Sequence, residues 1–382
     1  MSRRLKNKPK IAIIRSLGVR IAQAEFASKF KRFTPYLAGD LNPAVIKYAQ
    51  QSGLKYKDIP LKPAFPFDPV KILLGKVVHQ SWVGPDKDLL ESFLKAIDIF
   101  EIYEAYFFYS RYASEIAAKQ NKPLITEIWT SFPGHPAGFI WPYSVNVKRT
   151  IAATDLFILR SHRALDYLKP FRLPAGKKEV IYHGVNLKRF YPAKKEKTAI
   201  NILFAGTLTE NKGLGDILKI FPGLFRKHKN IKLTICGQGP LRREVERLAK
   251  IYPVKYVGQI AHQDMGKIYR EADIFCGPSR DYSTLGIKRW EEFVGYVFME
   301  ALASGLPIVT TDSGGIPEIV GKDNIVVPQK DSKALIRALT GLISDAQARR
   351  KIGVKNRIRA EKLFDLDRQV AQTEQILLKR FF

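Results

Sequence analysis

The chain has 382 residues, of which 46% are hydrophobic and 26% are charged, and this balance excludes a disordered or fibrous protein. Its length accommodates two α/β domains of ordinary size. The formal net charge of +28 favours polyanionic partners such as nucleic acid, anionic lipid or phosphorylated substrates, although a solvated lysine-rich surface would give the same value. Two cysteines, Cys236 and Cys276, exclude a disulfide framework and a paired-cysteine zinc motif, which favours a reducing compartment.

Membrane-spanning and secretory segments are not expected. No uninterrupted apolar run approaches the ~20 residues needed to span a bilayer. The longest candidate, Ile97–Tyr109, is broken by Glu101 and Glu104, and the basic start Met1–Lys10 lacks the long hydrophobic segment of a signal peptide. We therefore expect a cytoplasmic protein that is at most peripheral to a membrane.

Short apolar, β-branched runs alternate with helical stretches in the first half of the chain. The expected strands are Lys10–Ile14, Ala96–Ile102, Pro123–Ile128, Leu156–Leu159 and Glu179–Tyr182. The expected helices are Arg20–Phe33, Leu89–Lys95, Tyr109–Lys119, Asn146–Ala153 and Ala164–Leu168. Repeated prolines between Asp58 and Val70 predict a long irregular connection. Strands that alternate with helices, without hairpin signals, predict a parallel sheet built from βαβ units.

The alternation stops at a basic stretch, Asn186–Lys197, and then restarts, which predicts a domain boundary there. The expected strands are then Ile200–Phe204, Ile231–Cys236, Val254–Val257, Ile274–Cys276, Pro307–Thr311 and Ile325–Val327, with a further element at Ile316–Val320. The expected helices are Gly215–Lys227, Leu241–Ile251, Met265–Ala272, Val297–Ser304, Ser332–Ser344, Ala346–Glu361 and Leu366–Lys379. The chain is thus predicted to be an α/β protein with two Rossmann-like domains, residues 1–190 and 191–365, facing across a cleft. A C-terminal helical tail, residues 366–382, is expected to pack back on the first domain.

The most informative stretch of sequence runs from Trp290 to Pro307 and contains two spaced acids, Glu292 and Glu300. The first precedes an expected helix and the second lies about one turn inside it, with Gly295 between them. A helix N-terminus with open backbone amides is a ready site for pyrophosphate, and carboxylates are natural acceptors for vicinal sugar hydroxyls. The alternative is that both acids are ordinary surface or capping residues.

Three strand-end glycine turns add to this stretch. The first contains Gly206 and Lys212, and its lysine would neutralise a diphosphate above the sheet edge unless it is simply solvated. The second contains Gly237 and Gly239, which either wall a base pocket or only form a tight turn. The third is Ser313–Glu318. Such turns at the carboxyl ends of parallel strands are where doubly wound sheets bind ligands.

In this order and spacing the segments between about Asp155 and Asp365 resemble family 4 of the glycosyltransferases, with its two-Rossmann GT-B architecture, retaining transfer and E-x(7)-E motif. The resemblance implies that Lys212 contacts the donor phosphates, Glu292 the transferred sugar and Glu300 the ribose hydroxyls. It also implies that backbone amides beside Gly295 contact the pyrophosphate, namely those of Tyr296, Val297 and Phe298.

Two departures from the family pattern concern the site. The arginine that the family usually places beside the first glycine of the lysine turn is Thr207 here, so Arg280 or Arg289 is expected to supply the missing cation, and Arg280→Ala to raise the donor Kd well beyond tenfold. A histidine that many members carry near the anomeric carbon is Trp129 here. His135, six residues further along the same loop, is a candidate replacement, although a loop histidine is more often solvated.

The resulting hypothesis is transfer of a hexose from a nucleoside-diphosphate sugar, whose nucleotide stays open, to an acceptor hydroxyl. No metal site and no further cofactor are expected. Basic segments such as Arg3–Lys10 and Lys71–Lys87 suggest an anionic membrane carrying a lipid-linked acceptor. The alternatives are a sugar-nucleotide epimerase or phosphorylase of the same fold, or a protein that binds nucleic acid or an anionic surface. No sequence signature of a nucleic-acid-binding module supports a nucleic-acid partner.

Overall fold

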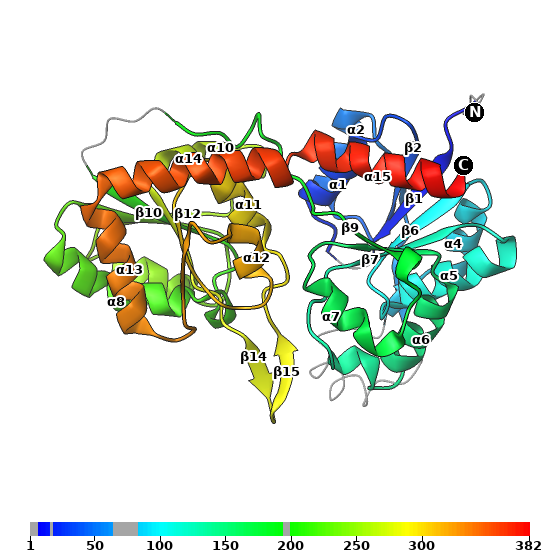
Figure 1. Ribbon diagram of the computed structural model, residues 1–382, viewed down its shortest axis with the longest axis horizontal. Helices are drawn as coiled ribbons and strands as arrows, with labels where there is room; N and C mark the ends of the chain where they lie inside the picture. The colour runs from blue at the N-terminus through cyan, green and yellow to red at the C-terminus, as the bar shows by residue number, and fades with distance from the viewer. Residues whose placement is uncertain (1–6, 16–17, 64–82, 194–198) are drawn as a thin grey trace. The chain divides into compact units, whose positions relative to one another are not determined.

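The computed structural model describes residues 7–15, 18–63, 83–193 and 199–382, which form two compact units (Figure 1). The first unit contains Met1–His183 together with Asp367–Phe382, and the second contains Gly184–Leu366. The change from one unit to the other therefore falls before the expected boundary at residues 190 and 191. The C-terminal segment belongs to the first unit.

The first unit is built on a parallel sheet, seven-stranded in the described ranges, with the order β3-β2-β1-β6-β7-β8-β9. Its strands are β1 (Lys10–Arg15), β2 (Thr34–Gly39), β3 (Lys55–Asp58), β6 (Ile99–Tyr103), β7 (Leu124–Ile128), β8 (Leu156–Leu159) and β9 (Lys178–Val180). Two short strands pair antiparallel beside it, β4 (Leu61–Pro63) and β5 (Val83–Pro85). The apolar runs expected from the sequence supply the central strands of this sheet, which are almost entirely buried.

Helices cover this sheet, and buried apolar side chains between Ala12 and Leu168 form a core against it. The helices are α1 (Ile21–Ser28), α2 (Pro43–Ser52), α4 (Lys87–Leu94), α5 (Phe108–Gln120), α6 (Tyr143–Ala153), α7 (Ala164–Leu168) and α15 (Leu366–Phe381), with 3-10 turns η1 (Pro136–Gly138), η2 (Lys169–Phe171) and η3 (Ala175–Lys177). The last helix, α15, is tied to the unit by Glu374, whose Oε1 accepts the backbone amides of Lys31 at 2.8 Å and Arg32 at 2.6 Å.

The second unit repeats the plan with a parallel sheet, six-stranded in the residues that the structure describes, of order β12-β11-β10-β13-β16-β17. Its strands are β10 (Ile200–Ala205), β11 (Ile231–Cys236), β12 (Val254–Gly258), β13 (Ile274–Gly277), β16 (Ile308–Thr311) and β17 (Ile325–Val327), with an antiparallel pair β14 (Tyr282–Thr284) and β15 (Ile287–Trp290). Its helices are α8 (Leu214–Lys227), α9 (Arg242–Ala249), α10 (Met265–Glu271), α11 (Tyr296–Ala303), α12 (Ile316–Val320), α13 (Ser332–Ser344) and α14 (Ala346–Leu363), with the 3-10 turn η4 (Glu210–Lys212).

The prediction of an α/β protein with Rossmann-like parallel sheets is confirmed, and one local prediction is wrong. The helix expected over Arg20–Phe33 ends at Ser28, and the chain then forms β2. The element at Ile316–Val320, whose type was left open, is a helix. The hairpin formed by β14 and β15 was not predicted. The proline-rich connection lies mostly outside the described residues, as do most of the basic segments Arg3–Lys10 and Lys71–Lys87.

The strand orders locate the place where each sheet can bind a ligand. In the second unit the order reverses between β10 and β13, and in the first between β1 and β6. Doubly wound sheets bind ligands beyond the carboxyl ends of the strands at such a reversal. In the part of the chain that the structure describes, no helix has the length and apolar character needed to cross a membrane.

Candidate active site

The carboxyl ends of β10 and β13 meet at the Lys212–Gly213 turn. Gly213 has φ of 75°, and a Cβ there would lie 1.8 Å from the carbonyl oxygen of Pro278. Only glycine therefore allows the loop after β10 to lie against the loop after β13. This close packing holds Lys212, the last residue of η4, over the switch point of the sheet.

Lys212 and Glu292 are brought together across these loops. The ammonium donates to Oε2 of Glu292 at 2.5 Å, and the hydroxyl of Ser279 lies 3.2 Å from the same oxygen. The lysine Nζ also lies 4.7 Å from the centroid of the Trp290 ring, at the end of β15. The other carboxylate oxygen of Glu292, Oε1, has no hydrogen-bond partner among the described residues, so it is available to accept from a ligand.

The loop after β16 supports the backbone of Glu292. The hydroxyl of Ser313 accepts the Glu292 amide at 3.2 Å, and the Gly315 amide donates to the Glu292 carbonyl at 2.8 Å. Gly314 has φ of 51°, and a Cβ there would lie 2.2 Å from that carbonyl oxygen. The glycine turn at Ser313, seen in the sequence only as a strand end, therefore holds the acid in place.

Helix α11 starts directly after this acid, as the sequence predicted. Its N-cap, Gly295, has φ of 62°, and the Phe298 amide donates to the Gly295 carbonyl at 3.1 Å. Tyr296 and Val297 are the first two helical residues. The start of a helix is the positive end of its dipole, which suits a phosphate group, although the Phe298 amide is already used by the Gly295 carbonyl here.

Glu300, one turn into α11, lies in a separate polar cluster. Its Oε1 is 3.4 Å from Nε2 of His262, and His262 Nδ1 is 3.0 Å from the Arg189 guanidinium. The hydroxyl of Tyr269 donates to the Val297 carbonyl at 3.2 Å, and burial together with the charge of Glu300 raises the pKa of this phenol. These neighbours of Glu300 were not predicted, because all of them are distant from it in the chain.

The glycines of the first two strand-end turns pack against each other. A Cβ on Gly237 would lie 1.8 Å from the Gly206 carbonyl oxygen, and a Cβ on Gly239 would lie 2.6 Å from the Leu208 carbonyl oxygen. The amide of Gly206 donates to the Cys236 carbonyl at 3.0 Å. These contacts give the glycines a packing role at the strand ends, while their predicted contact with a donor stays a prediction.

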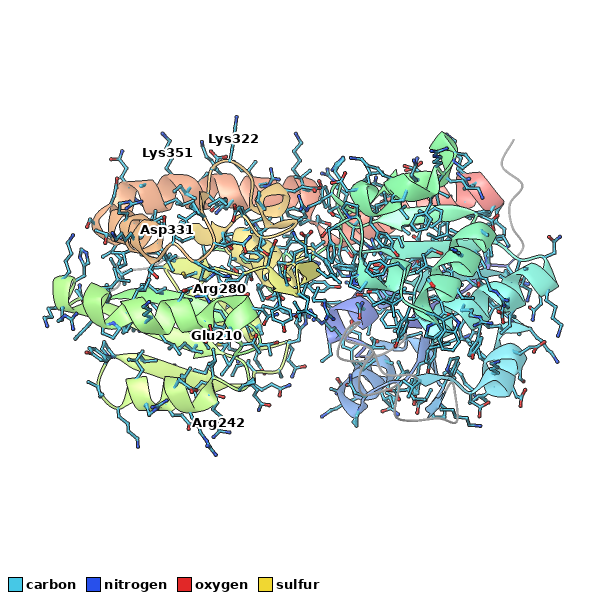
Figure 2. All side chains as sticks on the ribbon, turned by 90° about the horizontal axis from the view of Figure 1, so that it is seen from below. Glu210, Arg242, Arg280, Lys322, Asp331 and Lys351 are labelled. Carbon is cyan, nitrogen blue, oxygen red and sulfur yellow. The ribbon has the colours of Figure 1, made fainter. Side chains whose placement is uncertain are left out.

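Arg280, the cation expected to replace the residue missing at Thr207, already has two acidic partners, Asp216 and Glu210, of which Figure 2 labels Glu210. Its guanidinium forms a two-pronged ion pair with Asp216, with Nε 2.6 Å from Oδ2, and Nη1 lies 3.6 Å from Glu210. The hydrogen bond to Asp216 outweighs partial burial and raises the pKa of Arg280. Asp216 therefore neutralises the positive charge of Arg280, which was expected to contact a donor phosphate.

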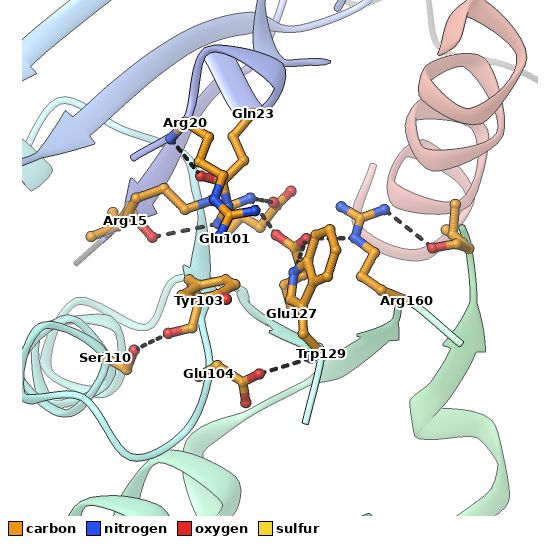
Figure 3. Close-up of polar contacts among 12 residues, drawn as sticks. Arg15, Arg20, Gln23, Glu101, Tyr103, Glu104, Ser110, Glu127, Trp129 and Arg160 are labelled. Carbon is orange, nitrogen blue, oxygen red and sulfur yellow. Dashed lines mark hydrogen bonds and ion pairs between the residues drawn. The ribbon is translucent and has the colours of Figure 1, made fainter. Parts of the chain in front are cut away.

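A network of buried charges lies at the corresponding end of the first sheet (Figure 3). Glu127 at the end of β7 contacts both arginines of the network, Arg15 and Arg160, and accepts from the Trp129 indole nitrogen at 2.7 Å. Arg15 also donates to Glu101 of β6 at 2.8 Å. Burial raises the pKa of Glu127, but the two guanidinium groups outweigh it and hold that pKa at about 2.

The two candidate residues of the loop after β7 are both buried. Trp129, which stands where the family often carries histidine, is 5% exposed and held by this network. His135 is 6% exposed; its Nδ1 accepts the Ala137 amide at 3.3 Å, and its ring stacks on Tyr106 at 5.1 Å between centroids. The expectation of a solvated loop histidine is therefore wrong, whereas its catalytic role stays a prediction.

Glu104 follows β6 and holds the same loop from the other side. It has φ of 56°, and its Oε1 accepts the amides of Trp129 at 2.9 Å and Thr130 at 2.8 Å. Its Oε2 is buried without a hydrogen-bond partner. Burial raises the pKa of this carboxyl to about 7, because the two amide hydrogen bonds only partly offset the loss of water.

We expect Glu104→Gln to remove part of the pH dependence of stability. The folded pKa lies above the ordinary value of 4.5, so the contribution of Glu104 is greatest below 4.5 and is lost as pH rises to about 7. The loss amounts to about 3 kcal/mol. Hydrogen exchange of the β6 and β7 amides at pH 4.5 and 8 should show the variant gaining stability relative to the wild type as pH rises. A difference that does not change with pH would contradict the assignment.

Comparisons with known proteins agree with this geometry. A family described as "Glycosyl transferases group 1" matches residues 199–345, the segment that carries Lys212, Glu292 and Glu300. The chain is 30% identical over 255 residues to the GDP-mannose-dependent monoacylated alpha-(1-6)-phosphatidylinositol monomannoside mannosyltransferase of Corynebacterium glutamicum, covering 62% of this chain and 66% of that protein. It is 24% identical over 283 residues to glycogen synthase of Mycobacterium tuberculosis, covering 70% and 65%.

Solved structures show the same fold at low sequence identity. Anabaena HepE in complex with UDP and glucose superposes with a TM-score of 0.76 at 15% identity, over 97% of this chain and 100% of that one. Sucrose-phosphate synthase from Thermosynechococcus elongatus gives 0.69 at 19% identity, over 98% and 99%. These matches place the chain in the GT-B class of two Rossmann-like domains.

Residues 199–345 match the group 1 glycosyltransferase family, and this match confirms the resemblance drawn from the E-x(7)-E motif. The sequence matches span about two thirds of the length of the curated relatives, 66% and 65%.

Proposed function

We propose that this protein transfers a hexose from a nucleoside-diphosphate sugar to an acceptor hydroxyl, with retention of the anomeric configuration. The observation that supports it most is the contact of Lys212 with Glu292 at the switch point of the second sheet, within the matched segment. The contact places a cation beside a carboxylate that has one available oxygen. A sugar nucleotide requires such a pair, because its phosphate would bind the cation and its sugar hydroxyl would bind the carboxylate.

The proposed roles follow from charge. Lys212 and the first-turn amides of α11, chiefly those of Tyr296 and Val297, would bind the diphosphate, because the Phe298 amide already donates to the Gly295 carbonyl at 3.1 Å. Oε1 of Glu292 would accept from the sugar, and Glu300 from the ribose. In the reaction the bond from the anomeric carbon to the phosphate oxygen breaks, the bond to the acceptor oxygen forms, and the acceptor proton passes to the departing phosphate. Preorganised cations and amides stabilise the charge that grows on that phosphate.

The donor nucleotide and the acceptor are proposed from the relatives. One relative is named for GDP-mannose and a phosphatidylinositol mannoside, and one solved relative holds UDP. A lipid-linked acceptor at an anionic membrane agrees with the net charge of +28. Among the described residues no cluster of His, Cys, Asp or Glu could hold a metal ion; the proposed phosphate contacts are a lysine and helix amides.

A coupled assay tests the proposal. Thermal shifts with UDP, GDP and ADP identify the nucleotide, since a ligand at 100 times its Kd stabilises by about 2.7 kcal/mol. The corresponding sugar nucleotide should then release nucleoside diphosphate only when an acceptor is present, with an α-linked product from an α-linked donor. Conversion of the sugar nucleotide without any acceptor would favour an epimerase, and cleavage of a glycan by inorganic phosphate would favour a phosphorylase. Indifference to every nucleotide would reject the proposal.

We expect Lys212→Ala to raise the Kd for the nucleoside diphosphate at least tenfold, because it removes the cation nearest the proposed phosphate position. Arg280→Ala is the matched comparison. Its effect should be smaller than Lys212→Ala and smaller than the sequence suggested, because Asp216 and Glu210 already neutralise this arginine. Titration calorimetry measures both. An Arg280→Ala effect equal to or larger than that of Lys212→Ala would reverse the assignment of the main phosphate cation.

A further inference from the structure

The turn of the hairpin β14–β15 contains a leucine, Leu285, that is unfavourable there for two reasons: its backbone conformation and its exposure to water. Thr284 and Ile287 pair across a two-residue turn, Leu285–Gly286, in which φ is 51° and 73°. Positive φ at both central positions is the type I′ arrangement, which strongly prefers Asn-Gly. Leu285 is 93% exposed, so its side chain is left in water by a backbone conformation that leucine disfavours.

Other exposed apolar side chains extend this turn. Ile287 is 37% exposed and Tyr282 is 47% exposed, and Figure 1 shows β14 and β15 as a ribbon that extends away from the sheet and helices of their own unit. We name Tyr282, Leu285 and Ile287 the hairpin tip. A residue that disfavours its backbone conformation, and whose side chain adds no packing to the fold, indicates a functional position.

The base of the hairpin is joined to the proposed active site. Lys288 forms ion pairs with Asp281 at 2.8 Å and Glu291 at 2.9 Å. Asp281 also accepts from the Ser313 hydroxyl at 2.7 Å, and Ser313 accepts the amide of Glu292 at 3.2 Å. The hairpin therefore has a fixed position relative to Glu292, and whatever the tip contacts is positioned relative to the transferred sugar.

The net charge of the chain and the length of the hairpin both indicate that the hairpin tip contacts an anionic lipid surface. A chain with a net charge of +28 is attracted to anionic headgroups. At about 3.3 Å per residue, the six residue steps from Gly286 to Glu292 place the turn up to about 20 Å from Glu292, and the polar layer of one leaflet is about 5–7 Å thick. A tip that enters the outer acyl layer would therefore hold Glu292 just above the headgroups, where a glycan on a lipid presents its hydroxyl.

We infer that the hairpin tip inserts into an anionic lipid bilayer and so presents the proposed active site to a lipid-anchored acceptor. The inference rests on the proposed function for the acceptor but not for the binding. Burying a leucine contributes about 1.5–3 kcal/mol, so the tip alone would bind weakly and needs the electrostatic attraction as a second contribution. Binding should thus require both Leu285 and anionic lipid.

Vesicle sedimentation of the full chain tests the inference with Leu285→Asn. Asparagine suits the type I′ turn, so the variant should fold at least as well as the wild type. It should bind vesicles of phosphatidylcholine with phosphatidylglycerol at least tenfold more weakly than the wild type, and the wild type should bind pure phosphatidylcholine poorly. Ile251→Asn, at a residue 74% exposed in the same unit but outside the hairpin, is the control and should bind like the wild type.

A second measurement separates the lipid surface from other contacts of the tip. Leu285→Asn should slow transfer to a lipid-anchored acceptor and leave transfer to the same glycan in free form, and nucleoside diphosphate binding, unchanged. Equal vesicle binding by wild type and variant would overturn the inference. An equal loss with the free glycan would overturn it too, by assigning the tip to the acceptor itself or to another part of the chain. If the vesicle result holds and no sugar is transferred, only the proposed function fails.

Discussion

Glu292→Gln is expected to reduce transfer by about 10²–10³-fold, the usual cost of removing one preorganised polar contact to a transition state. The amide keeps the shape of the side chain but donates where the carboxylate accepted. It therefore weakens the bond to a sugar hydroxyl at the proposed Oε1 position. It also removes the ion pair that holds Lys212 at 2.5 Å. Steady-state kinetics with the donor identified by thermal shift measure the effect.

Binding of the free nucleoside diphosphate distinguishes this role from a general disruption of the site. Once Glu292 is neutral, Lys212 has no carboxylate partner among the described residues, so the nucleotide without its sugar should bind the variant at least as tightly as the wild type. Glu246→Gln, which removes one member of a surface pair with Arg242, is the control and should leave turnover unchanged. Turnover of Glu292→Gln within twofold of the wild type would remove Glu292 from the proposed chemistry.

The parallel sheets could be predicted from the sequence because each buried strand is a short apolar run. Leu156–Leu159 and Ile231–Cys236 were predicted with the bounds that the structure gives. The hairpin was missed because its turn is Leu-Gly rather than Asn-Gly, and its strands, Tyr282–Thr284 and Ile287–Trp290, are too short to show an alternating pattern. The strand β2 was missed because it continues an apparently helical stretch.

The acidic motif could be predicted, but its surroundings could not. The spacing of Glu292 and Glu300 and the nearby glycines are local features of the sequence. The partner of Arg280, by contrast, is Asp216, which is distant in the chain and lies inside an amphipathic helix where it looks like a solvated residue. Pairing of this kind depends on which strands are neighbours in the sheet. Only the topology, with β10 beside β13, brings these two residues together.

The buried charges of the first unit were hidden for the same reason. Glu101 and Glu127 each lie in a mainly apolar strand. In the sequence, Glu101 was considered only because it breaks an apolar run, and Glu127 was not considered. In the structure β6 and β7 are neighbours, and Arg15 from β1 joins the two carboxylates. Burying such charges contributes little net stability when they are paired, but leaving one of them without its partner is costly.

Glu127→Gln is therefore expected to destabilise the first unit by about 3–5 kcal/mol. The change removes the negative charge that faces both Arg15 and Arg160, the second of which is fully buried. Denaturant dependence of hydrogen exchange at the β6, β7 and β8 amides measures the loss. Glu115→Gln, which alters an exposed pair with Arg111 on α5, is the matched control and should cost less than about 1 kcal/mol.

The pH dependence of this loss identifies its origin. Because the arginines hold the pKa of Glu127 at about 2, below the ordinary 4.5, its ionised form contributes stability that is fully present above 4.5. That contribution disappears as pH falls toward 2, so the difference between wild type and Glu127→Gln should shrink over the same range. A difference that stays constant to pH 2 would mean that the glutamine perturbs packing around Trp129 rather than charge. A loss no larger than that of Glu115→Gln would show that the buried arginines do not depend on this carboxylate.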